Sequence, residues 1–136
     1  MTTEYRKPLP FIEPDTRVFW EGLRRRDFYL PRCNDCQNYH WYPRSICPYC
    51  QSQNLTWIRA SGKGTVHTFT VTRQNTARGF RENLPYVLAI IELEEGVQVM
   101  SNIVGCEPGD VKIGLPVMVT FEDATPEVTL YKFRPR

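Results

Sequence analysis

The fold of this chain is decided by the stretch Cys33-Asn-Asp-Cys36-Gln-Asn-Tyr-His-Trp-Tyr-Pro-Arg-Ser-Ile-Cys47-Pro-Tyr-Cys50, which holds four of its five cysteines. These cysteines form two CxxC pairs separated by ten residues. Four thiolates can surround one zinc ion as a tetrahedron, and each tight CxxC turn presents two sulfurs on one side of a loop. Pro48 helps to fix the second turn. The spacing therefore predicts a four-cysteine zinc ribbon that binds one zinc ion per chain.

Other uses of these cysteines remain open but fit less well. Iron in a rubredoxin-like site would take the same four ligands. A thioredoxin-type redox site needs only one CxxC, usually at the start of a helix. A disulfide framework is disfavoured because the chain shows no export signal, and thiols stay reduced in the cytosol. A shell of four thiolates leaves no open position for a substrate, so we expect a structural metal that supplies most of the ribbon's folding energy.

Two further residues could be mistaken for parts of this site. His40 lies between the two pairs, but four cysteines already complete the shell, so we expect a side chain on the ribbon surface. Cys106 lies outside the pattern, and we expect a small packed side chain there.

Composition and charge indicate an ordinary soluble domain. The 136 residues carry a net charge of +2, and the sequence pI of about 8.3 is below the range typical of a nucleic-acid footprint. The longest apolar run, Tyr86 to Ile91, is far too short to cross a bilayer. The first residues contain no apolar core of signal-peptide length. We therefore expect a cytosolic protein.

The segment before the ribbon predicts an arm and one short helix. Residues 1–13 are polar with two prolines and should have no fixed structure of their own. A helix should follow over residues 15–27, with Asp15 as N-cap and one apolar face. The run Arg24 to Arg26 suits the negative end of the helix dipole, or alternatively a landing site for phosphates or an acidic partner.

The remainder of the chain reads as β-structure. Leu55 to Ile58 are strand-like, and five strands follow at about residues 65–72, 87–93, 97–103, 115–122 and 128–133. In the first of these strands the apolar alternation shifts phase once, which indicates a β-bulge. Glu95-Gly96 indicates a hairpin. Five short strands suit an OB-type barrel, although an SH3-like barrel or a small sandwich would show a similar pattern.

The predicted class is thus mainly β: a short N-terminal helical segment, a rubredoxin-like four-cysteine ribbon and a five-stranded OB-fold barrel. The predicted divisions are an arm and helix over residues 1–30, the ribbon over 31–58 and the barrel over 59–136. We expect the ribbon and the barrel to have separate cores.

No catalytic motif emerges from the sequence. It contains no GxSxG, HExxH, Walker or strand-associated GxGxxG pattern. His67 in the middle of a strand suggests a cross-strand hydrogen bond or a half-buried ring. Three glutamates near the hairpin, Glu92, Glu94 and Glu95, suggest solvated edge protection. A binding or scaffold role is favoured over catalysis.

Two kinds of ligand remain. Nucleic acid would require aromatic side chains interleaved with cations on the strands, whereas the strands carry mostly Val, Ile, Leu and Thr. A phosphorylated ligand with an apolar end would suit the loop of residues 73–86, where cations flank an aromatic side chain. The residues concerned are Arg73, Arg78, Phe80 and Arg81, which ordinary surface usage of arginine would explain equally well.

The order of motifs along the chain resembles one known family. It runs from Phe19-Trp20-Glu21-Gly22-Leu23 through the four cysteines to Ser61-Gly62-Lys63-Gly64-Thr65-Val66, Leu84-Pro85-Tyr86-Val87, Ile91-Glu92-Leu93-Glu94-Glu95-Gly96, Gly114-Leu115-Pro116-Val117 and Phe133-Arg134-Pro135. This order is similar to that of the small zinc-ribbon plus OB-fold proteins, long labelled as being of unknown function, that accompany thiolases and related acyl-CoA enzymes. The resemblance covers about residues 15–135.

The resemblance implies a non-catalytic, acyl-CoA-binding accessory subunit that docks on a thiolase-like or related enzyme. The loop residues above would then contact coenzyme A. Aromatic side chains near the front of the chain would anchor the partner, or would instead pack the helix and ribbon on the barrel; these are Phe19, Trp20, Trp41 and Tyr42. The rival hypothesis is a nucleic-acid-binding ribbon–OB protein.

Overall fold

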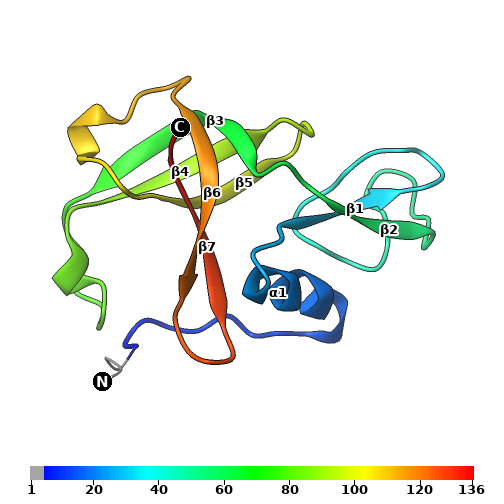
Figure 1. Ribbon diagram of the computed structural model, residues 1–136, viewed down its shortest axis with the longest axis horizontal. Helices are drawn as coiled ribbons and strands as arrows, with labels where there is room; N and C mark the ends of the chain where they lie inside the picture. Colours follow the sequence, from blue (N-terminus) through cyan, green and yellow to red (C-terminus); the bar gives the residue numbers. More distant parts are fainter. Residues whose placement is uncertain (1–4) are drawn as a thin grey trace.

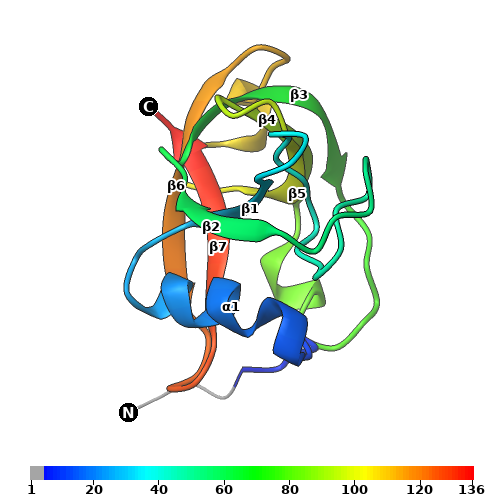
Figure 2. The same cartoon turned by 90° about the vertical axis from the view of Figure 1, so that its right-hand side faces the viewer.

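A cysteine-rich ribbon and a β-barrel lie side by side, with a short helix across their junction (Figure 1, Figure 2). The computed structural model describes residues 5–136. Its elements are η1 (Pro14–Thr16), α1 (Arg17–Arg24), β1 (Tyr29–Cys33), β2 (Leu55–Arg59), β3 (Lys63–Thr72), η2 (Arg81–Asn83), β4 (Tyr86–Leu93), β5 (Gln98–Ile103), η3 (Pro108–Asp110), β6 (Pro116–Asp123) and β7 (Thr129–Pro135).

The five strands predicted after the ribbon close into a barrel in the order β3-β4-β5-β7-β6, with β6 returning to β3. All neighbouring pairs are antiparallel except β5 and β7, which are parallel. The register of β3 against β4 shifts between Val66 and Thr68, so the predicted bulge is present. Gly96 has φ of 92° in the β4–β5 turn, where glycine adopts the left-handed region without strain. The OB-fold prediction is confirmed.

Alternating residues of the strands fill the barrel. Along β4, Val87, Ala89, Ile91 and Leu93 are buried, while Leu88 between them is exposed. Each fully buried aliphatic side chain contributes roughly 1.5–3 kcal/mol through the hydrophobic effect. The alternation read from the sequence is therefore the pattern that closes the barrel around its core.

The helix is shorter than predicted, and Asp15 is not its N-cap. Residues 14–16 form a 3-10 turn, and α1 begins only at Arg17 after Thr16. The helix ends in paired bonds from the amide of Arg26 to the carbonyl of Leu23 and from the amide of Asp27 to that of Gly22. Arg26, with φ of 66°, occupies the left-handed position that usually carries glycine in this helix ending.

The strand β1 was not predicted from the sequence. It pairs with β2 in antiparallel register, with Leu30 opposite Ile58, and together they form the base of the ribbon. Pro31 lies within β1, and proline normally argues against a strand because it cannot donate to the ladder. Its carbonyl oxygen still accepts a hydrogen bond from the amide of His40 at 3.2 Å.

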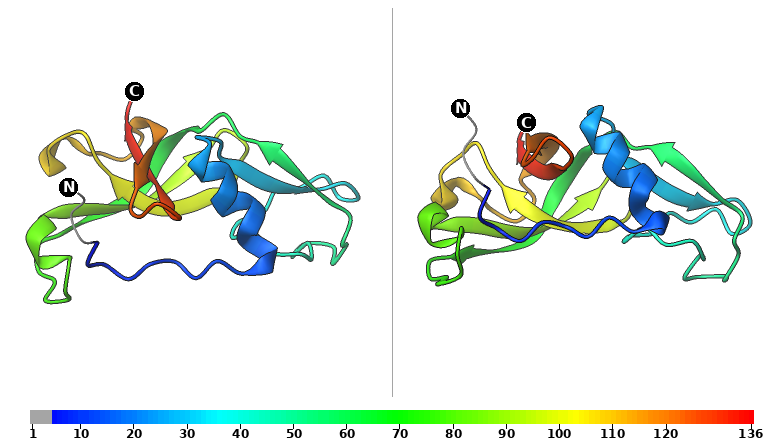
Figure 3. Two further views of the ribbon diagram at one scale, coloured as in Figure 1. Left: turned by 60° about the horizontal axis from the view of Figure 1, so that its bottom comes forward. Right: turned by 90° about the horizontal axis from the view of Figure 1, so that it is seen from below.

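The N-terminal segment runs along the barrel without regular secondary structure, as Figure 3 shows from below. Arg6 pairs with Glu82 at 2.9 Å, and the ammonium of Lys7 lies 5.4 Å from the ring centroid of Phe80. The first part of the predicted arm, residues 1–4, lies outside the described residues.

Within residues 5–136, no helix has the length and apolar character needed to span a membrane.

The ribbon, helix and barrel share one continuous core, so the expectation of separate cores is wrong. Phe19 of α1, Phe28 and Leu30 belong to the same buried cluster as the barrel residues Ile91 and Phe133. Trp41 and Trp57 of the ribbon pack against this cluster. A small ribbon gains apolar burial in this way that it could not generate alone.

Candidate functional site

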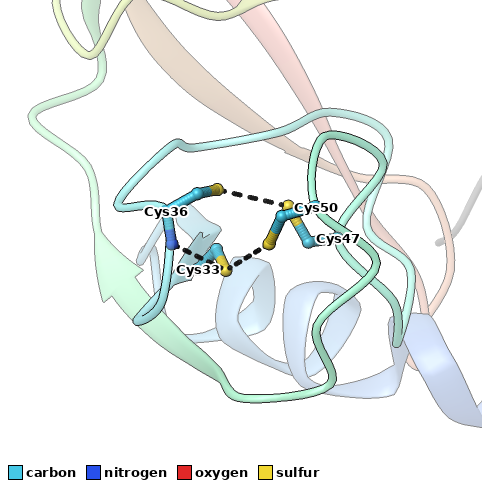
Figure 4. A group of neighbouring side chains, drawn as sticks. All are labelled: Cys33, Cys36, Cys47 and Cys50. Carbon is cyan, nitrogen blue, oxygen red and sulfur yellow. Dashed lines mark hydrogen bonds between the residues drawn. The ribbon is translucent and has the colours of Figure 1, made fainter.

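The four ribbon cysteines converge on one point, although the two pairs come from separate turns (Figure 4). All four sulfurs lie within 4.8 Å of one another, with Cys33 Sγ 3.5 Å from Cys50 Sγ and Cys36 Sγ 3.6 Å from Cys47 Sγ. Tetrahedral zinc with Zn–S bonds of about 2.3 Å would separate its sulfurs by about 3.8 Å. A disulfide would require about 2.05 Å. The cysteines are therefore positioned to bind one metal ion.

The two turns have matching local geometry. The amide of Gln37 donates to the carbonyl of Cys33, and that of Gln51 to the carbonyl of Cys47, each at 2.8 Å. Both glutamines have φ of 65°. The amide of Cys36 lies 3.4 Å from Cys33 Sγ, and that of Tyr49 lies 3.4 Å from Cys47 Sγ. Each turn thus aims backbone N–H groups at a sulfur.

These amides favour the thiolate form that a metal requires. The hydrogen bond from the amide of Cys36 is the main cause that lowers the pKa of Cys33 to about 6. Cys33 and Cys47 are buried, and Cys50 is exposed. A metal with four such sulfurs has no open position, so the site fits a structural role.

His40 is buried, and the expectation that it lies on the ribbon surface is wrong. Its side chain is only 1% exposed, and neither ring nitrogen has a hydrogen-bond partner. Burial lowers its pKa, so the ring is neutral. It is not a member of the four-sulfur cluster.

The aromatic side chains proposed as partner anchors divide into buried and exposed members. Phe19 is fully buried, and its ring centroid lies 4.9 Å from Trp41 and 5.6 Å from Tyr131 of β7. Trp20 is 7% exposed and donates its indole N–H to the hydroxyl of Tyr42 at 3.0 Å. Packing inside the chain therefore accounts for Phe19 and Trp20. Trp41 is half-buried, and Tyr42 is 38% exposed.

The loop proposed to contact coenzyme A presents its cations to solvent. The three arginines Arg73, Arg78 and Arg81 are all exposed. Phe80 instead lines a pocket of about 360 Å³, where its ring lies 5.9 Å from that of Tyr86. The loop therefore combines an exposed cationic surface with an apolar pocket wall.

The same pocket also holds Cys106 and three residues that the sequence did not single out, namely Lys7, Asn102 and Lys132. Lys132 comes from β7 and Asn102 from β5, two strands that pair in parallel. Only the barrel topology brings them together, so no local pattern could have indicated the site. Burial is the main cause that raises the pKa of Cys106, which suits the packed, unreactive thiol expected from the sequence.

The other candidate acid and base groups lie at the surface. His67 is about half exposed, with Nδ1 4.0 Å from Glu92 Oε2. Glu92 and Glu94 are exposed, as expected for edge protection. Glu95 is half-buried and accepts a hydrogen bond from the amide of Ser61 at 3.0 Å.

A rubredoxin-like zinc ribbon followed by an OB-fold barrel is the class of protein that this fold and this cysteine site define. The chain belongs to the ChsH2 family, whose rubredoxin-like zinc ribbon domain matches residues 20–56 and whose C-terminal OB-fold domain matches residues 57–122. The resemblance noted from the sequence is confirmed.

Relatives of the family include both short and long chains. A DUF35 domain-containing scaffold protein of Methanocaldococcus jannaschii is 40% identical over 124 residues, which cover 85% of this chain and 87% of the relative. A probable enoyl-CoA hydratase alpha subunit of Thermomonospora curvata is 34% identical over 129 residues, which cover 95% of this chain. This chain spans only 40% of the length of that subunit.

Among solved structures, a chain of an Ltp2-ChsH2(DUF35) aldolase has the same fold. It matches with a TM-score of 0.84 and 34% sequence identity, covering 93% of this chain and 98% of that one. The similarity thus extends through both the ribbon and the barrel.

Proposed function

We propose that this chain is a cytosolic, non-catalytic accessory subunit that docks on a thiolase-like or related acyl-CoA enzyme and helps to bind acyl-CoA. The observation that carries the proposal is similarity along almost the whole chain to proteins named as scaffolds and as a subunit of an enoyl-CoA hydratase. The match to a chain of an Ltp2-ChsH2(DUF35) aldolase supports an enzyme as the partner.

The chemistry of the side chains is consistent with a non-catalytic role. The four ribbon thiols face one another and are positioned to bind one metal ion. The ring of His40 is sealed from solvent, while His67 lies on the open surface. General acid–base catalysis needs a titrating group held within hydrogen-bond reach of the substrate, and neither histidine lines the pocket of about 360 Å³ described above.

A docking surface is available on the second cysteine turn. Three large apolar side chains there are exposed: Tyr42 at 38%, Ile46 at 44% and Tyr49 at 65%. A metal bound by the four cysteines would restrain this turn, so little conformational entropy would be lost when a partner covers it. We propose that the ribbon docks on the enzyme through these residues, next to Trp41.

The proposed coenzyme A contacts remain Arg73, Arg78, Arg81 and Phe80. Exposed guanidinium groups beside an apolar wall suit a ligand with phosphates at one end and a thioester chain at the other. In the nucleic-acid alternative, stacking aromatics and cations should cover the outer face of β4 and β5. That face instead carries Leu88, Ile90 and Met100, so the structure offers no support for it.

The test is reconstitution with an acyl-CoA enzyme that copurifies with the untagged chain from its native cells. The chain alone should turn over no acyl-CoA, and adding it to the purified enzyme should raise binding and activity. Ile46→Asp should weaken the assembly at least tenfold because it buries a carboxylate at the interface. Ile113→Asp, at a residue 70% exposed on the barrel, is the matched control. Enzyme-like turnover by the isolated chain would overturn the proposal.

A further inference from the structure

The pocket beside the N-terminal segment contains an unusual lysine. Lys132 lies on β7 and is half-buried, and its ammonium donates a hydrogen bond to Asn102 Oδ1 at 2.7 Å. The amide nitrogen of Asn102 donates in turn to the carbonyl of Val87 at 2.9 Å. This second bond fixes the orientation of the Asn102 side chain, so its oxygen points at the ammonium.

The ammonium of Lys132 has hydrogen-bond donors that the bond to Asn102 does not use. An ammonium carries three donors, and one of them is used by Asn102. None of the ion pairs formed by residues 5–136 includes Lys132. Burial is the main cause that lowers its pKa, and the nearby Lys7 acts in the same direction, whereas Glu122 opposes it. A partly desolvated cation that forms no close ion pair binds an anion more strongly than a fully hydrated one.

The rest of the pocket is suited to the apolar part of a ligand. Phe80, Tyr86, Ile103, Val104 and Pro108 line it, and Lys7 reaches over the ring of Phe80. The volume of about 360 Å³ lies at the lower end of the range for small-molecule sites. An apolar wall therefore faces two ammonium groups across one small pocket.

We propose that this pocket binds an amphipathic anion, with a single phosphate or carboxylate at Lys132 and Lys7 and an apolar body along Phe80 and Tyr86. The inference rests on the proposed function for the source of the ligand. The phosphopantetheine arm of coenzyme A and a free acid with an alkyl chain both carry this chemistry.

Glu122 allows a test in which two substitutions should change the binding affinity in opposite directions. This carboxylate also lines the pocket, and it is exposed. It repels a bound anion, so neutralising it should tighten binding, whereas removing the charge of Lys132 should weaken binding. A role for Lys132 in folding alone would not produce opposite effects on affinity from these two substitutions.

The experiment is calorimetric titration of the full, zinc-loaded chain with three probes: 4′-phosphopantetheine, hexanoate and inorganic phosphate. We expect saturable binding of at least one amphipathic probe, with inorganic phosphate weaker because it leaves the apolar wall uncovered. Lys132→Met should weaken that binding about tenfold or more, and Glu122→Gln should tighten it a few-fold. Lys112→Met, at an exposed lysine elsewhere on the barrel, should change nothing. Affinity should also fall as the pH rises through the alkaline range, where the phosphate is already fully ionised, because Lys132 then loses its charge.

Every outcome of this titration bears on the proposal. Binding of 4′-phosphopantetheine alone identifies the arm of coenzyme A as the ligand, and binding of hexanoate alone identifies a free acid. The proposal is wrong if neither probe saturates in the millimolar range, if phosphate binds as tightly as both, or if affinity is unchanged in Lys132→Met. Zinc content and thermal unfolding show whether that variant is folded, and Glu122→Gln provides the test if it is not.

Failure here is separable from failure of the proposed function. A chain that assembles with an acyl-CoA enzyme but binds no probe contradicts only the pocket. A chain that binds a probe but assembles with no such enzyme contradicts only the accessory role.

Discussion

At the scale of single residues, the ribbon depends on sulfur atoms that cannot be replaced by oxygen. Zinc prefers thiolates in closed tetrahedral sites, and a serine hydroxyl is a much weaker ligand. The four sulfurs are already gathered within 4.8 Å of one another, so the metal completes a site that the fold has shaped.

We predict that elemental analysis finds one zinc per chain in the wild-type protein. Cys47→Ser should abolish this stoichiometric zinc binding. Cys106→Ser removes a thiol outside the cluster and should retain the zinc. Since the ribbon shares its core with the barrel, Cys47→Ser should also lower the thermal midpoint of the barrel. Stoichiometric iron in the purified chain would contradict the assignment of zinc.

A second residue-scale prediction concerns Phe19, the centre of the aromatic cluster. Phe19→Ala leaves a cavity between the helix, the ribbon and β7, and should lower the free energy of unfolding by about 3–5 kcal/mol. Phe11→Ala makes the same chemical change at a side chain that is 82% exposed, and should cost well under 1 kcal/mol. Denaturant unfolding of both variants measures the difference, and equal effects would contradict the cluster's role.

At the scale of elements, an ion pair ties the segment just after α1 to the barrel, in addition to the apolar packing of the helix. Both terminal nitrogens of Arg26 donate to the two carboxylate oxygens of Asp123 at 2.9 Å. Thr129 donates to the same carboxylate at 2.7 Å. Arg26 thus forms an ion pair within the chain. From the sequence alone, this arginine run suggests only the helix dipole or an external anionic partner, and neither describes this contact.

This ion pair predicts a specific dependence of stability on pH. The guanidinium of Arg26, followed by the hydroxyl of Thr129, holds the pKa of Asp123 well below its usual range. The carboxylate therefore stabilises the folded state above its unfolded pKa of about 3.9, and this contribution is lost as the pH falls below that value. The difference in unfolding free energy between wild type and Asp123→Asn should shrink from pH 7 to pH 3. Glu127→Gln, an exposed carboxylate in the same hairpin, should show no such trend.

Elements with a local signature were predictable from the sequence. The CxxC spacing, the alternation of β4 and the slip in β3 each depend on residues close together in the chain. The bulge after Val66 and the turn at Gly96 therefore appear where the pattern placed them.

Features that depend on distant contacts were not predictable. The core formed by Phe19 and Tyr131 joins residues more than 100 positions apart, so no local pattern reveals it. The burial of His40 depends on how the folded chain packs around it, and a polar side chain in a cysteine loop carries no signal of that burial. The pocket around Lys132 requires the parallel pairing of β5 with β7.

At the scale of the whole molecule, the ribbon and the barrel offer two different surfaces and are joined by one continuous core. Three exposed apolar side chains, Tyr42, Ile46 and Tyr49, lie on the second cysteine turn and the loop before it, while the arginine loop lies at the far end of the barrel (Figure 1). In the proposed complex, the shared aromatic core would let docking at one end place the other end against the partner. This arrangement favours a ligand site completed by two proteins over one enclosed by this chain alone.

We therefore predict that the loop arginines act on coenzyme A within the assembled complex. Arg78→Ala combined with Arg81→Ala should weaken coenzyme A binding about tenfold or more, because each shielded guanidinium–phosphate contact contributes on the order of 1–3 kcal/mol. Arg24→Ala combined with Arg25→Ala makes the same change in net charge at the end of α1 and should leave the affinity unchanged. Calorimetry on each intact complex gives the comparison, and the wild-type affinity should fall as salt screens the exposed contacts. Unchanged affinity in the loop double variant would place the coenzyme A phosphates elsewhere, whereas equal weakening in both double variants would mean that net charge alone attracts the ligand.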